Sequence, residues 1–137
     1  MIDRDSINEV VVIDDNSIDL IINSKVVQLV NVGKTIFKND SAEDVLINLN
    51  ERIIGGLKAP DLILLDIMMP LVTGLDFLDQ IDKMPAEFIE GLKIVMVTSS
   101  LDPGDYSLAM SHKNVIAFLG KPLTPQKLES VFLDDFG

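Results

Sequence analysis

The sequence predicts an α/β protein built on a five-stranded parallel sheet with helices on both faces. Short apolar runs typical of buried strands alternate along the chain with longer segments of helical periodicity. Several of these apolar runs also end at an acidic or hydroxyl residue, as at Asp14, Asp66 and Thr98. The length of 137 residues and the hydrophobic content of 47% are those of one folded domain.

The first strand is expected at residues 10–13, where four consecutive β-branched side chains indicate a central strand buried on both faces. Two aspartates follow it, and Asn16 is expected to cap the next helix. The apolar residues of that helix fall on one stripe, as expected for a face that packs on a core: Ile18, Ile21, Ile22, Val26, Leu29 and Val30. Gly33 is expected to end the helix.

The remaining elements follow from the same two patterns. Further strands are expected at residues 34–38, 61–65, 93–97 and 115–119. Further helices are expected to begin near the capping or turn residues Ser41, Gly74, Asp102 and Thr124. Gly55 and Gly56 end the first of these helices, and the second stops before Pro85. Residues 1–8 are expected to form a loose leader, so that residues 9–137 make up one domain.

The composition excludes several classes of protein. Eleven Lys and Arg against 22 Asp and Glu give a formal net charge of −11, which opposes binding to a nucleic-acid backbone. Cysteine is absent, which excludes thiolate catalysis and Cys-ligated metals. No apolar run approaches the roughly 20 residues of a membrane helix, and the N-terminus lacks the features of a signal peptide. We therefore expect a cytoplasmic protein with no direct contact to nucleic acid or membrane.

Four polar side chains are expected to meet at one edge of the sheet, namely Asp14, Asp15, Asp66 and Thr98. In an open parallel α/β sheet, ligands bind beyond the carboxyl ends of the strands. Three carboxylates in one pocket repel one another unless a cation neutralises them, and Mg²⁺ suits carboxylates combined with waters and a phosphate. Lys121, just after the last strand, is a fifth candidate because its ammonium group neutralises a carboxylate or holds a phosphoryl oxygen.

Five separated motifs occur in a fixed order along the chain: Asp14-Asp15, then Asp66-Ile67-Met68-Met69-Pro70, then Gly74, then Val97-Thr98-Ser99, and finally Lys121-Pro122. This order resembles the receiver domain of two-component response regulators over about residues 9–135. The resemblance implies a flavodoxin-like, doubly wound (βα)5 fold with strand order 2-1-3-4-5.

The resemblance also implies how the acidic residues divide their roles. Asp66 matches the residue that accepts the phosphoryl group. Asp14 and Asp15 match the acidic pair that organises Mg²⁺, and the backbone carbonyl of Met68 matches a further ligand of the ion. No cofactor other than Mg²⁺ is implied, and the domain would be a signalling phosphoacceptor rather than an enzyme, assisting only its own Mg²⁺-dependent phosphorylation and dephosphorylation.

Three further residues match the switch of the family. Thr98 matches the hydroxyl residue that turns toward the phosphoryl group, Lys121 its cationic partner, and Phe118 the aromatic residue that changes rotamer with Thr98. The implied phosphodonor is a sensor histidine kinase or a phosphotransfer protein, and the implied output is a protein target. Because no effector domain follows Gly137, a stand-alone receiver similar to chemotaxis regulators is expected, with a domain excised from a larger regulator or hybrid kinase as the alternative.

Two alternatives are less favoured by the residues. A Mg²⁺-dependent phosphatase of the haloacid dehalogenase type would carry a D-x-D motif after its nucleophilic strand, whereas Asp66-Ile67-Met68 lacks the second aspartate. A pseudo-receiver would be an interaction module that is no longer phosphorylated. It is disfavoured because the chemical positions Asp66, Thr98 and Lys121 and the acidic pair are all present.

Overall fold

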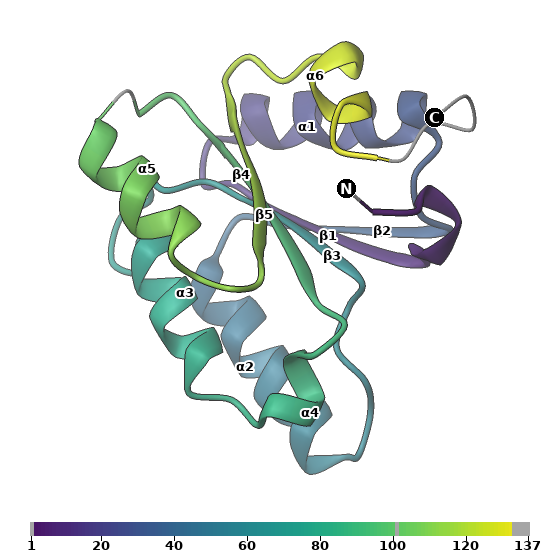
Figure 1. The fold of residues 1–137 in the computed structure, drawn as a ribbon, viewed down its shortest axis with the longest axis vertical. Coiled ribbons are helices and arrows are strands. Elements are labelled where there is room, and N and C mark those ends of the chain that lie inside the picture. The colour runs from purple at the N-terminus through teal and green to yellow at the C-terminus, as the bar shows by residue number, and fades with distance from the viewer. Residues whose placement is uncertain (1, 101, 133–137) are drawn as a thin grey trace.

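The computed structural model describes residues 2–100 and 102–132, which form one parallel sheet covered by helices (Figure 1). The strands are β1 (Glu9–Ile13), β2 (Thr35–Asn39), β3 (Leu62–Leu65), β4 (Lys93–Thr98) and β5 (Val115–Gly120). The helices are α1 (Ser17–Val30), α2 (Ala42–Ile54), α3 (Gly74–Asp82), α4 (Ala86–Ile89), α5 (Pro103–Met110) and α6 (Pro125–Glu129). The five strands are parallel and lie in the order β2-β1-β3-β4-β5, which confirms the predicted sheet.

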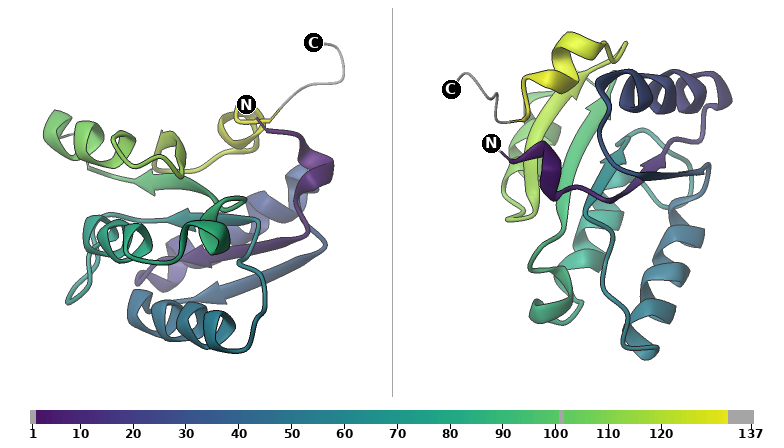
Figure 2. Two further views of the ribbon diagram at one scale, coloured as in Figure 1. Left: turned by 60° about the horizontal axis from the view of Figure 1, so that its bottom comes forward. Right: turned by 90° about the vertical axis from the view of Figure 1, so that its right-hand side faces the viewer.

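The sheet separates two hydrophobic cores (Figure 2). Successive strand residues point to opposite faces, so Val11 and Ile13 face α2 and α3, whereas Val10 and Val12 face α1 and α6. The central strand β3 is buried on both faces along its whole length. This burial explains why its sequence is a continuous apolar run rather than an alternating one.

Most expected helix starts are confirmed by their capping bonds. The side chains of Asn16, Ser41, Asp102 and Thr124 each accept a backbone N–H in the first turn of the helix that follows. The end of α1 differs from the expectation, because Asn31 rather than Gly33 stops the helix. Asn31 adopts a left-handed conformation with φ 60°, and its N–H bonds back to the last turn.

The predicted apolar stripe of α1 is confirmed for Val26 and Val30 and wrong for its other four residues. The helix buries Val26, Val27 and Val30 in its second half. Ile18, Ile21, Ile22 and Leu29 are exposed, with 67%, 55%, 38% and 72% of their surface accessible. In place of the first three, the polar side chains of Asn23 and Ser24 are buried. Ser24 can be buried because its hydroxyl donates to the Leu20 carbonyl in the preceding turn.

The expectation of a loose leader over residues 1–8 is contradicted for residues 2–8. Ile2 and Ile7 are buried in the core beneath α1 and α6, and Ile2 forms a parallel bridge with Phe132. Between them lies a 3-10 turn, Arg4–Ser6. Arg4 donates to the Val30 carbonyl at 2.8 Å, which ties the segment to the end of α1. Two buried isoleucines therefore make this segment part of the packed domain.

The short helix α4, between α3 and β4, had no counterpart in the sequence-based expectations. Asn114, which is buried just before β5, donates from Nδ2 to the carbonyls of Ile89 and Leu92, both at 2.8 Å. These bonds tie the residue before β5 to the segment that follows α4, where the Ile89 carbonyl also accepts the Leu92 N–H at 3.1 Å. Among the described residues, no helix is long and apolar enough to cross a membrane.

Candidate functional site

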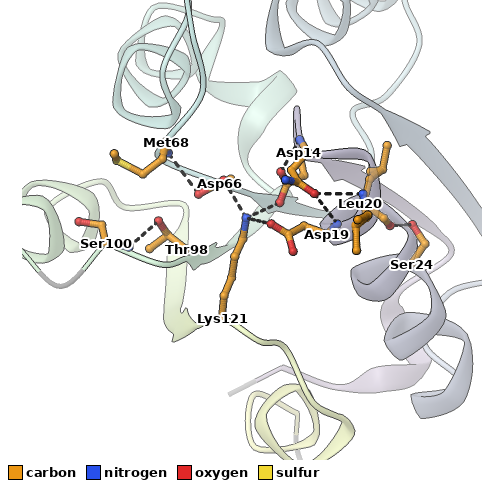
Figure 3. Close-up of polar contacts among 11 residues, drawn as sticks. Asp14, Asp19, Leu20, Ser24, Asp66, Met68, Thr98, Ser100 and Lys121 are labelled. Atoms are coloured by element: carbon orange, nitrogen blue, oxygen red, sulfur yellow. Dashed lines mark hydrogen bonds and ion pairs between the residues drawn. The ribbon is translucent and has the colours of Figure 1, made fainter.

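Asp14 and Asp66 emerge side by side at the carboxyl edge of the sheet (Figure 3). Strands β1 and β3 pair in register with Ile13 opposite Leu65, so the next residue of each strand reaches the same edge. Both carboxylates are buried, with 0% and 3% of their surface exposed, whereas Asp15 is exposed. Asp14, Asp15 and Asp66 each place one carboxylate oxygen within 4.8 Å of the other two. The structure thus brings together the three predicted carboxylates.

The Asp14 carboxylate shows how strongly the site concentrates negative charge. Burial raises the pKa of Asp14, although the Lys121 ammonium group and the Asn16 N–H act in the opposite direction. Oδ1 accepts the Asn16 N–H at 3.0 Å. Oδ2 is buried and makes an ion pair with Lys121 at 2.7 Å, but this contact lacks hydrogen-bond geometry. A buried carboxylate oxygen without a hydrogen bond is a suitable ligand for a hard cation.

Lys121 lies among the carboxylates, as the sequence predicts. Its Nζ donates to Asp66 Oδ2 and to Asp19 Oδ2, both at 2.9 Å, in addition to the ion pair with Asp14 (Figure 3). Burial alone would lower the pKa of Lys121, but the three carboxylates outweigh burial and raise it. Lys121 is therefore a permanent positive charge at the centre of the cluster.

The turn that carries Lys121 is held by two contacts. The Lys121 N–H donates to the Thr98 carbonyl at 2.9 Å, which anchors the turn to the end of β4. Lys127, on α6, donates to the carbonyls of Gly120 and Pro122 at 2.9 and 3.0 Å. Lys127 was not among the residues expected at the site, and its spacing from Lys121 gives no signal that could have revealed this contact.

The loop after β3 is shaped by a close approach to the α3 N-terminus. The Met68 N–H donates to Asp66 Oδ1 at 3.2 Å, so the carboxylate is bound from both of its oxygens. Gly74 lies against this loop, where an added Cβ would collide with the Asp66 carbonyl and come within 2.8 Å of Ile67 Cα. A glycine is therefore required at the start of α3. The Met68 side chain is exposed.

Thr98 and Phe118, the two expected switch residues, contact groups other than the three carboxylates. The Thr98 hydroxyl is buried and accepts the Ser100 N–H at 3.1 Å. The Ser100 hydroxyl in turn donates to Asp105 at 2.7 Å, which links the end of β4 to the first turn of α5. Phe118 lies partly buried on β5. The structure therefore groups Asp14, Asp15, Asp66 and Lys121, places Thr98 next to that group at the end of β4, and packs Phe118 against Tyr106 of α5.

Asp19 is a residue of the site that sequence reasoning missed. It lies in the first turn of α1, and its carboxylate points toward Lys121 (Figure 3). An aspartate in a first turn is usually explained by the helix dipole alone. The contact with Lys121 depends on α1 folding back over the end of β1, and residues 102 positions apart in the chain give no local signal of it.

A parallel α/β sheet with order 2-1-3-4-5 and an acidic pocket at its carboxyl edge defines the doubly wound class of proteins. Within this class, the family model of the response regulator receiver domain matches residues 10–132. The chain belongs to the response regulator receiver domain family, whose members act in two-component phosphorelay signalling. Receiver domains bind Mg²⁺ through acidic residues, and this chain supplies a cluster of them.

Solved structures agree with this assignment. A two-component response regulator from Cytophaga hutchinsonii superposes with a TM-score of 0.80 at 27% identity, covering 91% of this chain and 93% of that one. A response regulator receiver protein from Dyadobacter fermentans has a TM-score of 0.76 at 24% identity, with 90% and 93% covered. The chemotaxis protein CheY4 of Vibrio cholerae has a TM-score of 0.71 at 18% identity, with 90% and 94% covered. The last two show the fold alone. No curated protein matches the chain by sequence.

Proposed function

We propose that Asp66 accepts a phosphoryl group from a sensor histidine kinase or a phosphotransfer protein. The observation that carries this proposal is the position of its carboxylate, which terminates the central strand, lies beside Asp14 and Asp15, and receives a hydrogen bond from Lys121 at 2.9 Å. Asp66 is also the carboxylate at which both the Met68 amide and the Lys121 ammonium group converge.

Asp14, Asp15 and Asp66, together with the backbone carbonyl of Met68, are the proposed ligands of Mg²⁺. Oxygen ligands are the kind that Mg²⁺ prefers, and the hydrogen-bond-free Oδ2 of Asp14 supports a cation at this place. When bound, Mg²⁺ supplies positive charge that offsets the negative charge building up on the transferring phosphoryl group.

The transfer itself needs little covalent chemistry from the protein. A carboxylate oxygen of Asp66 attacks phosphorus in line, and a new O–P bond forms as the P–N bond of phosphohistidine breaks. The electron pair of that bond stays on the imidazole nitrogen of the donor, and the imidazole leaves in its neutral form because its other ring nitrogen carries a proton. Lys121 orients Asp66 and stabilises a phosphoryl oxygen, which is positioning and electrostatic catalysis.

Thr98 and Phe118 are the proposed switch residues. In the structure the Thr98 hydroxyl is bonded to the Ser100 N–H, so turning toward a phosphoryl oxygen would release the connection that leads through Ser100 to Asp105 on α5. A shift of Phe118 would then alter the surface made by α5 and β5, to which a downstream protein would bind.

Residues 9–137 are proposed to form the receiver domain together with the packed segment 2–8, and the family match over residues 10–132 supports this proposal. The proposed setting is the cytoplasm, where histidine kinases present their phosphorylated domains. Direct binding to nucleic acid is not proposed, because the net charge of −11 opposes it.

The proposal is tested by treating the purified protein with acetyl phosphate and Mg²⁺ and measuring intact mass and peptide masses. We expect one phosphoryl group on Asp66, and none on the Asp66→Asn protein. Asp44→Asn, which changes an exposed aspartate on α2, is the matched control and should be labelled like the unaltered protein. Failure to label the unaltered protein would support a pseudo-receiver instead.

A further inference from the structure

Lys121 has one carboxylate partner that lies outside the proposed metal site. Its Nζ donates to Asp66 and to Asp19 at equal distances of 2.9 Å, and makes an ion pair with Asp14 at 2.7 Å. Asp14 and Asp66 belong to the group of oxygens that are close enough to hold a metal ion together, whereas Asp19 does not. The role of Asp19 is therefore separate from that of the other two carboxylates.

The position of Asp19 is fixed by the start of α1. Asn16 caps this helix and accepts the N–H groups of Ile18 and Asp19, both at 3.0 Å. The Asp19 side chain keeps 34% of its surface exposed, compared with 0% for Asp14 and 4% for Asp66. Asp19 thus stands at the solvent-facing rim of the site, on a rigid first turn that aims it at Lys121.

A cation at the proposed metal site and the Lys121 ammonium group compete for the same two carboxylates, those of Asp14 and Asp66. Lys121 contacts Asp14 and Asp66 at Oδ2, both carboxylates belong to the proposed metal site, and two cations on the same carboxylates repel each other. Asp19 Oδ2 is the one of these three partners of Lys121 that does not belong to the proposed metal site.

We propose that Asp19 is a positioning residue that keeps Lys121 at the site when Mg²⁺ takes over Asp14 and Asp66. This inference rests on the proposed metal site. When Mg²⁺ binds, Asp19 would remain as the carboxylate partner of Lys121. The ammonium group would then stay within reach of a phosphoryl group without blocking the ion. Asp19 acts through Lys121 and need not touch phosphate or metal.

The Lys121 ammonium group gives a direct readout of this role. Its ¹⁵Nζ–¹H signal is visible when hydrogen bonds slow proton exchange, and it is assigned by its loss in Lys121→Arg. With saturating Mg²⁺ we expect the signal to persist in the unaltered protein and to vanish in Asp19→Asn. Lys127 donates to the carbonyls of Gly120 and Pro122. Its signal is the internal reference and should persist in both proteins.

The affinity for Mg²⁺, measured by calorimetry, is the second readout. In Asp19→Asn, Lys121 has only Asp14 and Asp66 left as partners, so it competes harder with the ion, and we expect Kd to rise about three-fold. Asp44→Asn is the matched control, because Asp44 occupies the same third position of α2 behind its cap Ser41 and is not one of the carboxylates that Lys121 contacts. It should leave both readouts unchanged.

The outcomes separate this inference from the proposed function. If the unaltered protein binds no Mg²⁺, the proposed metal site is overturned, and the reason for moving Lys121 falls with it. If Mg²⁺ binds but the Lys121 signal persists in Asp19→Asn, only the role of Asp19 is overturned. A weaker affinity combined with an unchanged Lys121 signal also overturns it, since Asp19 would then act through its charge alone.

Discussion

The ring of Tyr106 meets the ring of Phe118 edge to face, with centroids 5.2 Å apart and planes inclined by 72°. Tyr106 lies half exposed on α5, and Phe118 lies on β5 against the core beneath α3 and α5. Edge-to-face pairs contribute about 0.5–1.5 kcal/mol beyond the area that they bury. The contact therefore restrains the proposed switch residue through a helix that is also bonded to Ser100.

Removing the Tyr106 ring should loosen Phe118. We expect Tyr106→Ala to lower the free energy of unfolding by about 1 kcal/mol and to let the Phe118 ring sample a second rotamer. Aromatic ¹³C NMR of Phe118 and chemical denaturation measure the two effects. Tyr106→Phe keeps the ring and should behave like the unaltered protein. A Phe118 spectrum that is the same in Tyr106→Ala would show that the ring pair restrains nothing.

Replacing the buried Asp14 carboxylate should weaken metal binding and raise the free energy of unfolding. Burial raises the pKa of Asp14, so the folded state binds its proton more tightly than the unfolded state, and the favourable contribution present at low pH is lost as pH rises. At neutral pH the charge therefore costs stability. We expect Asp14→Asn to raise the free energy of unfolding by about 1 kcal/mol in EDTA and to weaken Mg²⁺ binding. An Asp14→Asn protein that unfolds more easily would contradict this account.

Asp61 should stabilise the fold in the opposite pH direction. Burial opposes ionisation of Asp61, but the N–H groups of Glu9 and Asn8, both at 2.9 Å, outweigh it and lower the pKa below the ordinary value of 3.8. The contribution is therefore present above the unfolded-state pKa and lost as pH falls through the folded-state value.

We accordingly expect Asp61→Asn to be about 1 kcal/mol less stable than the unaltered protein at pH 7, with the gap closing as the pH falls below the ordinary carboxyl pKa of 3.8. Denaturation curves across this range measure it. Lys58→Met is the control, since Lys58 is exposed and its ion pair with Asp61 at 3.3 Å should contribute little. A gap that does not depend on pH would mean that the carboxylate charge is not involved.

Asn114 should matter for stability although it lies far from the site. It is buried, and its Nδ2 donates to the carbonyls of Ile89 and Leu92. Asn114→Ala would remove both bonds and leave the Ile89 carbonyl only the Leu92 N–H. We expect a loss of about 2–4 kcal/mol in the free energy of unfolding. Asn50→Ala removes a comparable side-chain-to-carbonyl bond on exposed α2 and should cost less than about 1 kcal/mol. Equal losses in the two variants would show that burial does not strengthen the Asn114 contacts.

The sequence predicts the parts of the structure that are determined by residues close together in the chain. The strands were predictable because a run such as residues 62–65 is apolar throughout, and the helix starts because caps such as Asn16 precede them. The grouping of Asp14 and Asp66 followed from a general property of parallel sheets.

The remaining features depend on how distant segments pack. Asp19 and Lys127 reach the Lys121 turn only because α1 and α6 lie beside it on the folded sheet. Ile18 and Val26 are equally apolar in sequence, and only the direction in which α1 crosses the sheet leaves one exposed and the other buried. The burial of Ile2 likewise depends on its contact with Phe132, at the other end of the described chain.

The bridge between Ile2 and Phe132 makes the described chain nearly a closed ring. The N–H of Ile2 donates to the Val131 carbonyl at 3.4 Å, and both segments lie near the amino ends of the strands, opposite the carboxylates. A short peptide joining residues 2 and 132 would therefore permit circular permutation, with new ends opened in an exposed turn such as Gly55-Gly56. Chain connectivity and the geometry around Asp66 can thus be varied independently.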